Sequence, residues 1–396
     1  MKLERCEFMW NKNKPIKVLF VSHTGNMYGG AEKSLLQLLK NIDRKRIDPV
    51  VIIPRSGLLE VELNRSGIRT YKVKYTRWVR DHPVGILTFF YCIILELLAL
   101  PRFIYIIKKE KINVVYTNTI VIFSGAISAF ITRIPHIWHI REIIKNNPDL
   151  SFFFRNKLLL DFIMEFSNRI IAISQAVANQ FSVNNLNKIK VVPNAVNFHV
   201  FDGCKSFPDI NGTNPEDYLV AVIGTLQKRK GQDYAIRGIK AVNWKVPNIK
   251  LLLIGKHSNN YKKYLEKLVA ELGLSGKVIF TGYRNDVPQI LPFCKILLMP
   301  SLDEPFGRIT IEAMAAGVPV IGVNSGGTKE IIQDGVTGYL VSTEDPSEMA
   351  ERIIKLYDNP ELAKKIGNNG KKLVLKKYNM ETHIQSIEKV IIETIC

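Results

Sequence analysis

The sequence has few cysteines, and none of them forms a Cys-x-x-Cys pair. The five cysteines are an odd number and lie far apart, which is typical of a protein in a reducing compartment. Residues 1–14 are polar and of mixed charge, without the continuous apolar stretch that a secretory signal needs. We therefore expect a cytoplasmic protein.

Acidic residues are also scarce relative to basic ones. The chain has 36 Asp and Glu against 55 Lys and Arg, a formal net charge of +19. This excess predicts attraction to an anionic partner such as nucleic acid, lipid headgroups or a phosphorylated small molecule. The basic residues are spread along the chain without a helix-turn-helix, zinc or aromatic-stacking module, so we expect no nucleic-acid partner. A non-catalytic polyanion-binding protein is an alternative supported by the charge alone.

The length of 396 residues and a hydrophobic content of 46% predict two globular domains of ordinary size. Short apolar runs alternate with helix-length segments, which indicates parallel sheets covered on both faces. The predicted strands are 17–22, 50–53, 114–117, 137–140, 170–173 and 189–192, and then 218–223, 250–254, 277–280, 296–299, 318–323 and 338–341. The fold class is therefore α/β, with two doubly wound, Rossmann-like domains.

Residues 202–216 are dense in Gly, Pro, Asn and Asp, which is the composition of a linker. We place an N-terminal domain at 1–201, the linker at 202–216 and a C-terminal domain at 217–380. The final segment, 381–396, has a helical pattern and could return to pack on the N-terminal domain.

One strongly apolar segment, between Val84 and Ile107, departs from the alternation of strands and helices. Glu96 and Pro101 interrupt it, which leaves less than the ~20 continuous apolar residues of a membrane span. Two interpretations stay open. The segment is either a buried helix of the α/β layer or a face that rests on an anionic membrane.

The strongest chemical pattern is DEPFGRITIEAMAAGVPV at 303–320. Glu304 and Glu312 are two acids with seven residues between them, and Gly307 comes just before a helical pattern whose first amides can bind an anion. Either acid alone would suit a solvated helix end. Together, two carboxylates can accept hydrogen bonds from several sugar hydroxyls, which favours a sugar-phosphate site.

Other candidates lie at the predicted carboxyl ends of strands. Gly29 and Gly30 follow the first strand and open a helix, where backbone can approach phosphate closely. His139 lies near the end of a strand, the edge at which open α/β sheets bind ligands, although a lone histidine there is often structural. Three further polar residues at this edge could contact a second substrate, the acceptor of a transferred group, and we call them acceptor-side candidates: Asn118, Arg141 and Glu142.

Jointly, these motifs resemble the retaining glycosyltransferases of family 4, in particular those of bacterial cell-envelope polysaccharide synthesis. The resemblance spans nearly the whole chain. It is carried by GGAE at 29–32, HIWHIRE at 136–142, PNAVN at 193–197, Lys-Gly at 230–231, the two acids of 304–312 and DGVTGYLV at 334–341. It implies the GT-B architecture, in which two Rossmann-like domains face each other across a cleft.

The resemblance also implies a nucleotide-sugar donor, with UDP favoured by family frequency, and a hydroxyl of a saccharide or lipid-linked acceptor. No cofactor or metal is expected, and the sequence has no Asp-x-Asp metal clamp. The implied catalytic residues are His139 near the donor sugar, Lys230 on the diphosphate and Glu304 on the sugar hydroxyls, while Glu312 binds the ribose. The implied donor-binding set is Gly29, Gly30, Lys230, Glu304, Phe306, Gly307, Arg308, Ile309 and Glu312.

The chain departs from the family at Thr225, where an Arg often follows the glycine and binds the diphosphate. Either Lys228 or Arg229 could substitute for this Arg, or the site could be weaker, but a basic run in a loop favours a solvated surface for both residues. A nucleotide-sugar epimerase or a sugar phosphorylase on the same architecture is the alternative enzyme.

Overall fold

A computed structural model describes residues 14–396 except 28, 80–84, 145–146, 148–149, 151, 153–155, 182–186, 202–205, 257–258 and 343–344. Val84 and residues 202–205, which belong to two of the sequence predictions, lie outside the described residues. The chain forms two compact units. Unit 1 comprises Met1–Asn194 and Glu381–Cys396, and unit 2 comprises Ala195–Met380.

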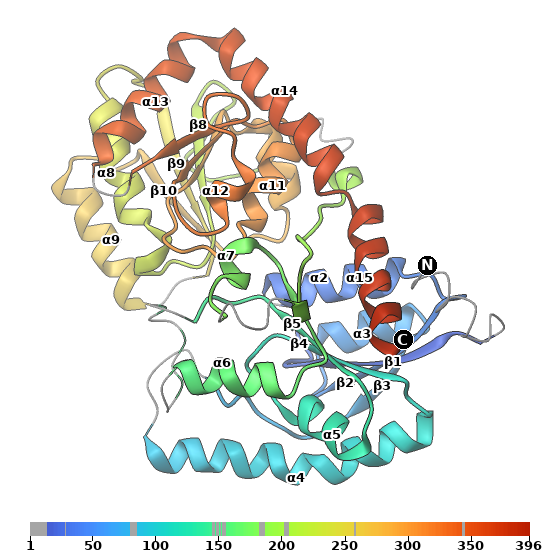
Figure 1. Cartoon of the computed structure of the whole chain (residues 1–396). Coiled ribbons are helices and arrows are strands. Elements are labelled where there is room, and N and C mark those ends of the chain that lie inside the picture. The colour runs from blue at the N-terminus through green and yellow to red at the C-terminus, as the bar shows by residue number, and fades with distance from the viewer. Residues whose placement is uncertain are drawn as a thin grey trace. The chain divides into compact units, whose positions relative to one another are not determined.

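Unit 1 contains a parallel sheet of seven strands in the order β3-β2-β1-β4-β5-β6-β7 (Figure 1). The strands are β1 (Ile16–Ser22), β2 (Ile47–Ile53), β3 (Arg69–Lys72), β4 (Val114–Asn118), β5 (His136–Ile140), β6 (Arg169–Ala172) and β7 (Ile189–Val191). Central strand β1 is continuously apolar because helices cover both of its faces, and Val18 to Val21 are fully buried. The strand order reverses between β1 and β4, the position at which doubly wound sheets bind ligands.

The helices that connect these strands are α2 (Gly30–Asn41), α3 (Leu58–Arg65), α4 (Ile86–Glu110), α5 (Ser124–Thr132), α6 (Asn156–Glu165) and α7 (Gln175–Ala178). Helix α15 (Met380–Ile395) follows unit 2 in the sequence, and its residues from Glu381 on belong to unit 1. Helix α4 packs on α5, and the carboxylate of Glu96 in α4 accepts from the amides of Phe123 and Ser124 at 3.0 and 2.8 Å. Glu96 therefore satisfies two of the free N–H groups at the start of α5.

Unit 2 contains a parallel sheet of six strands in the order β10-β9-β8-β11-β12-β13. The strands are β8 (Tyr218–Ile223), β9 (Ile249–Ile254), β10 (Val278–Gly282), β11 (Ile296–Met299), β12 (Val320–Val323) and β13 (Tyr339–Val341). The other elements are η2 (Phe198–Phe201), η3 (Lys228–Lys230), α8 (Gln232–Val242), α9 (Asn259–Glu271), α10 (Val287–Ile290), η4 (Leu291–Phe293), α11 (Arg308–Ala315), α12 (Thr328–Ile331), α13 (Pro346–Asp358) and α14 (Pro360–Lys377).

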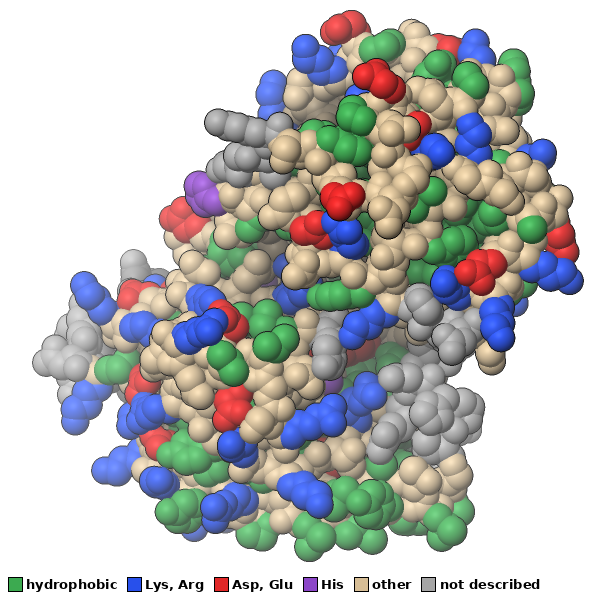
Figure 2. Space-filling view, turned by 180° about the vertical axis from the view of Figure 1, so that it is seen from behind, with side chains coloured by type: hydrophobic (Ala, Val, Ile, Leu, Met, Phe, Trp, Pro, Cys, Tyr) green, Lys and Arg blue, Asp and Glu red, His purple; other side chains and the backbone are tan. Residues whose placement is uncertain are grey.

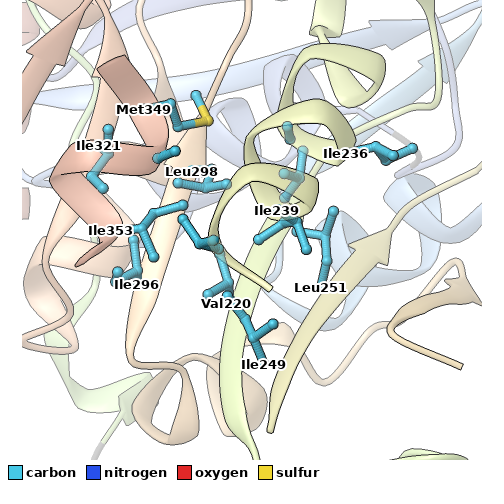
Figure 3. Close-up of a cluster of buried hydrophobic side chains, with 14 of the residues drawn as sticks. Val220, Ile236, Ile239, Ile249, Leu251, Ile296, Leu298, Ile321, Met349 and Ile353 are labelled. Atoms are coloured by element: carbon cyan, nitrogen blue, oxygen red, sulfur yellow. The ribbon is translucent and has the colours of Figure 1, made fainter. Parts of the chain in front are cut away.

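The core of unit 2 forms where α8 and α13 pack on the sheet (Figure 3). Ile236 and Ile239 of α8 are three positions apart, so they lie on one face of the helix, and both are fully buried. They pack with Val220 and Leu251 of the sheet and with Ile353 of α13. Burial of each such side chain contributes about 1.5–3 kcal/mol to the free energy of folding. This core stabilises the sheet whose strands carry the site at their carboxyl ends.

The two doubly wound domains predicted from the sequence are confirmed, and each predicted strand overlaps an observed one. Strand β3 was not predicted. The unit boundary lies at Asn194–Ala195 instead of residue 201, because the amide of Val196 already donates to the carbonyl of Tyr378 in unit 2 at 3.0 Å. Residues 206–216 of the predicted linker contain no helix or strand and belong to unit 2. Residues 381–396 belong to unit 1, where Glu388 accepts from the amide of Asp43 at 2.9 Å.

Candidate active site

Two predicted catalytic residues of unit 2 are in direct contact. Nζ of Lys230 lies 2.5 Å from Oε2 of Glu304, and both side chains are largely buried, with 16% and 14% of their surface exposed. Lys230 ends η3, which follows β8, and Glu304 lies in the loop after β11. Because β8 and β11 are neighbours in the sheet, their carboxyl ends bring the two charges together.

Backbone contacts hold the two loops in this position. Gly231 has φ of +67°, and a Cβ there would lie 2.3 Å from the carbonyl oxygen of Pro300, so only glycine allows this approach. The amide of Leu302 donates to the carbonyl of Arg229 at 2.9 Å, and the amide of Gly327 donates to the carbonyl of Glu304 at 2.7 Å. The Lys230–Glu304 pair is therefore held by the backbone as well as by its own charges.

Glu304 has a second cation beside it. Burial raises the pKa of the Glu304 carboxyl, but Lys230 and Arg229 outweigh that effect and hold the pKa below its ordinary value. Nη1 of Arg229 lies 3.7 Å from Oε2 of Glu304. The sequence-based interpretation of Arg229 as a solvated residue is therefore wrong, because the 3-10 turn at η3 directs it towards Glu304. Lys228 and Thr225 are exposed.

The start of α11 lies directly after Glu304. Gly307 precedes the helix with φ of +88°, and Arg308 and Ile309 form its first turn. Arg308 Nε donates to Oε1 of Glu312 at 2.8 Å, so the second acid of the motif pairs with its own helix. The ring of Phe306 is buried and lies 5.8 Å from that of Tyr378. The first amide of α11, that of Arg308, thus lies four residues beyond Glu304 of the carboxylate–cation pair.

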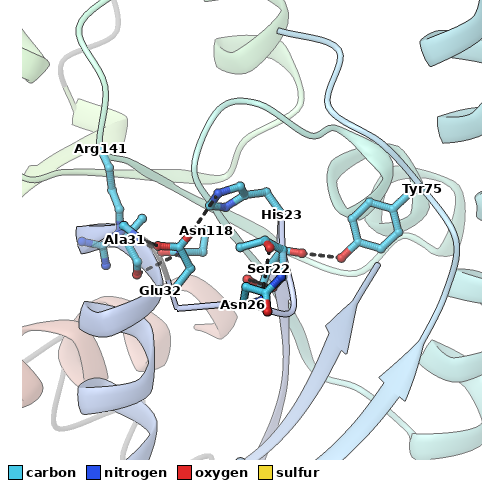
Figure 4. Close-up of polar contacts among 10 residues, drawn as sticks. Ser22, His23, Asn26, Ala31, Glu32, Tyr75, Asn118 and Arg141 are labelled. Carbon is cyan, nitrogen blue, oxygen red and sulfur yellow. Dashed lines mark hydrogen bonds and ion pairs between the residues drawn. The ribbon is translucent and has the colours of Figure 1, made fainter. Parts of the chain in front are cut away.

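In unit 1, the side chain of Arg141 connects several predicted residues. Its guanidinium donates to Oδ1 of Asn118 at 2.8 Å and to Oδ1 of Asn194 at 2.7 Å, and Nη2 lies 3.3 Å from Nδ1 of His139. Asn118 in turn donates to the carbonyl of Ala31 in α2 at 3.4 Å (Figure 4). The ends of β4 and β5 and the start of α2 therefore share one polar network.

His139 is completely buried in this network. Burial, with the charge of Arg141 beside it, holds the pKa of His139 well below its ordinary range, so the ring is neutral at physiological pH. The hydroxyl of Tyr116 also contacts Nδ1, and Nε2 has no hydrogen-bond partner among the described residues. Because Tyr116 and Arg141 both contact Nδ1, Nε2 is the ring nitrogen left to hydrogen-bond a ligand.

Glu142 is the remaining acceptor-side candidate. Its Oε2 accepts from the amides of Arg141 and Ile120 at 3.0 and 3.3 Å. Burial raises the pKa of Glu142 above its ordinary value. Because the carboxylate already binds two backbone amides, Glu142 orients the chain after β5 in this structure.

The glycine loop contains His23, which the sequence interpretation did not mention, and Glu32, which it named only as the last residue of the GGAE motif. The amide of Gly29 donates to Oε2 of Glu32 at 3.0 Å, and Nε2 of His23 lies 3.1 Å from Oε1 (Figure 4). Burial raises the pKa of Glu32, but His23 and the Gly29 amide outweigh this and lower it. The amide of Gly29 is thus already bound to a carboxylate, and Gly30 begins α2. The signal in the sequence was an acid three residues after a helix start, the spacing of a capping box.

Within the part of the chain that the structure describes, no three His, Cys, Asp or Glu side chains gather as a metal site would require.

Two family models match the chain. The model described as Glycosyltransferase Family 4 matches residues 28–200, and the model described as Glycosyl transferases group 1 matches residues 205–373. Their matched regions correspond largely to unit 1 and unit 2.

Curated relatives and solved structures agree with these matches. An uncharacterised glycosyltransferase of Methanocaldococcus jannaschii is 29% identical over 294 residues, which cover 72% of this chain and 76% of the relative. CapM of Staphylococcus aureus, a capsular polysaccharide biosynthesis glycosyltransferase, is 28% identical over 310 residues, covering 74% of this chain and 80% of CapM. The crystal structure of HepE from Anabaena in complex with UDP and glucose matches with a TM-score of 0.78 and 25% identity, covering 95% of this chain and 99% of HepE.

Proposed function

The chain belongs to the group 1 glycosyltransferases of family 4, with the GT-B fold, and on that premise we propose that it transfers a sugar from a nucleoside-diphosphate sugar to an acceptor hydroxyl with retention of anomeric configuration. The contact between Lys230 and Glu304 carries this proposal. It places a cation and a hydrogen-bonding carboxylate at the carboxyl ends of adjacent strands, beside the start of α11.

The departing nucleoside diphosphate gains negative charge as the bond to the anomeric carbon breaks. Lys230, with Arg229 next to it, is positioned to stabilise that charge, and the first amides of α11 add partial positive charge. A cation that acts more strongly on the leaving group than on the intact donor lowers the barrier. This role requires no divalent metal.

The environment of Glu304 argues against a covalent glycosyl-enzyme intermediate at this acid. Its carboxylate is bound by Lys230 and lies near Arg229, and both contacts reduce its nucleophilicity. We propose instead that Glu304 accepts hydrogen bonds from donor-sugar hydroxyls and that Glu312 binds the ribose. The acceptor oxygen forms the new glycosidic bond on the face from which the diphosphate leaves, and the acceptor proton passes to the released diphosphate.

The choice of substrates rests on the relatives. UDP is the favoured nucleotide because the HepE crystal contains UDP and glucose. A saccharide or lipid-linked glycan of a cell-surface polysaccharide is the favoured acceptor because CapM belongs to capsular polysaccharide biosynthesis. The scattered cysteines favour the cytoplasm as the place of reaction.

Thermal unfolding of the full chain with UDP-, GDP- and ADP-sugars tests the donor. A donor at about 100 times its dissociation constant stabilises the fold by roughly 2.7 kcal/mol, so one nucleotide class should raise the melting temperature. The stabilising donor is then incubated with candidate acceptors, and the anomeric configuration of the product is determined by NMR. Inverted product contradicts retention, and conversion of donor to another nucleotide sugar without acceptor indicates an epimerase.

A further inference from the structure

Helix α4 of unit 1 is apolar on two opposite faces. Its inner face, which includes Cys92, Phe103 and Ile107, is buried in unit 1. The face turned away from the unit exposes large apolar side chains, and we call these residues the α4 outer face: Ile86 (52% exposed), Leu87 (83%), Phe90 (50%), Tyr91 (57%), Ile94 (53%), Leu97 (47%), Leu98 (70%) and Tyr105 (55%). Single exposed apolar residues are common, but a continuous stripe along one helix marks an interaction surface.

The outer face continues into basic residues. No charged side chain is exposed from Ile86 to Leu98, whereas Arg102, Lys108, Lys109 and Lys111 are all exposed towards the end of the helix. In the space-filling view, hydrophobic and basic side chains gather along the edge of the molecule that α4 forms (Figure 2).

The acids of α4 do not cancel these charges. Glu96 is fully buried, and Glu110 is buried and accepts from Arg69 at 2.7 Å. Tyr105 lies between two cations, with Arg102 and Lys109 each 5.9 Å from its ring centroid. An apolar stripe with an aromatic ring among cations is the pattern of a helix at the boundary between lipid headgroups and acyl chains.

Length and composition alone would also allow α4 to cross a bilayer, since it has 25 residues and contains an 18-residue stretch with a mean hydropathy of 2.0. Its inner face argues against crossing. Glu96 is bound to the amides of Phe123 and Ser124, and Phe103 is completely buried. Insertion across the membrane would remove these partners and place a carboxyl in the acyl core, so a helix lying in the plane of the interface is the arrangement that keeps unit 1 intact.

A second copy of the chain is a poorer occupant for this surface. In a two-fold dimer, a parallel pairing of two α4 helices would set basic end against basic end, and an antiparallel pairing would set each basic end on an apolar stripe. Neither pairing provides the negative charge that Arg102, Lys108 and Lys109 require. An anionic bilayer provides both negative headgroups and an apolar interior.

We propose that the α4 outer face docks on the surface of an anionic phospholipid bilayer, with Ile86 to Leu98 in the acyl boundary and the basic end on the headgroups. This interaction goes beyond the proposed glycosyl transfer and does not depend on it. In the cell it places unit 1 at the inner surface of the plasma membrane, where a lipid-linked acceptor is presented.

Flotation of the full chain with vesicles tests the proposal. The vesicles are either pure phosphatidylcholine or phosphatidylcholine with about 30 mol% phosphatidylglycerol. One variant carries Leu87→Ser, Phe90→Ser and Leu98→Ser. Its control carries Leu58→Ser, Val61→Ser and Trp244→Ser, which are large apolar residues exposed outside α4. A second variant carries Arg102→Gln, Lys108→Gln and Lys109→Gln, and its control carries Lys364→Gln, Lys365→Gln and Lys371→Gln on α14.

The wild type and both controls should float with the anionic vesicles at least about tenfold more than with neutral ones. Both α4 variants should lose at least about tenfold in bound fraction while keeping the wild-type melting temperature and donor stabilisation. Unchanged flotation of the α4 variants would overturn the proposal, as would absence of flotation in the wild type. A wild-type dimer that the Leu87, Phe90 and Leu98 changes turn into a monomer would assign the face to a second copy. If alkaline carbonate does not extract the bound protein from the vesicles, α4 crosses the bilayer and the proposal is overturned.

Discussion

Nη2 of Arg141 lies 3.3 Å from Nδ1 of His139, and the hydroxyl of Tyr116 contacts the same nitrogen. Because a guanidinium can only donate, we predict that Nδ1 accepts and that the ring proton is on Nε2. Because burial and Arg141 hold the pKa of His139 well below its ordinary range, this tautomer persists at neutral pH. His139 therefore presents an N–H donor and not a base.

Nitrogen NMR of the histidine side chains tests this assignment. We expect Nε2 of His139 to be protonated, Nδ1 to be unprotonated, and neither resonance to titrate between about pH 6 and 8. His139→Gln, which can place an amide donor near the position of Nε2, should retain more activity than His139→Ala. A protonated Nδ1 or a titration near neutrality would contradict the assignment.

The buried carboxyl of Glu96 should make stability depend on pH. Burial raises its pKa from 4.5 to about 7. Between these values the folded chain keeps a proton that the unfolded chain has lost, so the stability contributed by this group falls as pH rises from 4.5 to 7 and stays constant above 7. Between pH 4.5 and 7, the free energy of unfolding of the wild type should fall by roughly 3 kcal/mol relative to that of Glu96→Gln.

Urea unfolding of both proteins at several pH values measures that difference. Glu271→Gln, which removes a carboxyl that is 57% exposed on α9, serves as the control for the loss of a carboxyl elsewhere. If the difference in free energy of unfolding between the wild type and Glu96→Gln is the same at every pH, the raised pKa of Glu96 is contradicted.

The apolar core made most of the fold predictable from the sequence. Strands such as β8 and β11 are buried on both faces, so each is a short apolar run whose ends can be located. Strand β3 has the sequence RTYK and lies at the edge of its sheet, where half-exposed polar side chains leave no apolar run. Its place in the sheet depends on pairing with β2, which periodicity does not encode.

The candidate site was predictable where one segment contained the pattern. Glu304, Gly307 and Glu312 lie within one motif, and Arg308, the partner of Glu312, lies there too, but the cations beside Glu304 come from another segment of unit 2. The contact of Arg229 with Glu304 depends on the turn at η3. A three-residue basic run in a loop looks the same whether its side chains face solvent or a buried acid, so the sequence did not distinguish Arg229 from Lys228.

Gly231 should be required for both stability and activity. In Gly231→Ala the new Cβ would collide with the carbonyl of Pro300, and the residue would also be held at positive φ. Gly273 has the same φ of +67° but open space around it, so Gly273→Ala isolates the backbone strain. We expect Gly273→Ala to cost about 1 kcal/mol without loss of transfer, and Gly231→Ala to cost at least about 2 kcal/mol with strongly reduced kcat/KM. Equal effects of the two substitutions would contradict this account of the Lys230 loop.

Arg229 should contribute to kcat/KM for the donor, although the sequence predicted a solvated side chain. Arg229→Gln removes one of the two cations near Glu304 and should lower kcat/KM for the donor by about three- to tenfold, a modest effect because the side chain is partly exposed. Lys228→Gln, a substitution of an exposed neighbour in the same turn, should leave kcat/KM unchanged. Steady-state kinetics that show equal losses for the two substitutions would indicate a general effect of charge in the loop.

We propose that Lys230 and Glu304 form part of a nucleoside-diphosphate site. Isothermal titration calorimetry of UDP, GDP and ADP with the wild type and with Lys230→Gln measures this binding. We predict that one of the three nucleotides binds the wild type and that Lys230→Gln weakens its binding at least about tenfold, equivalent to about 1.4 kcal/mol. Equal affinity of the two proteins for that nucleotide, or no binding of any of the three to the wild type, would contradict the claim.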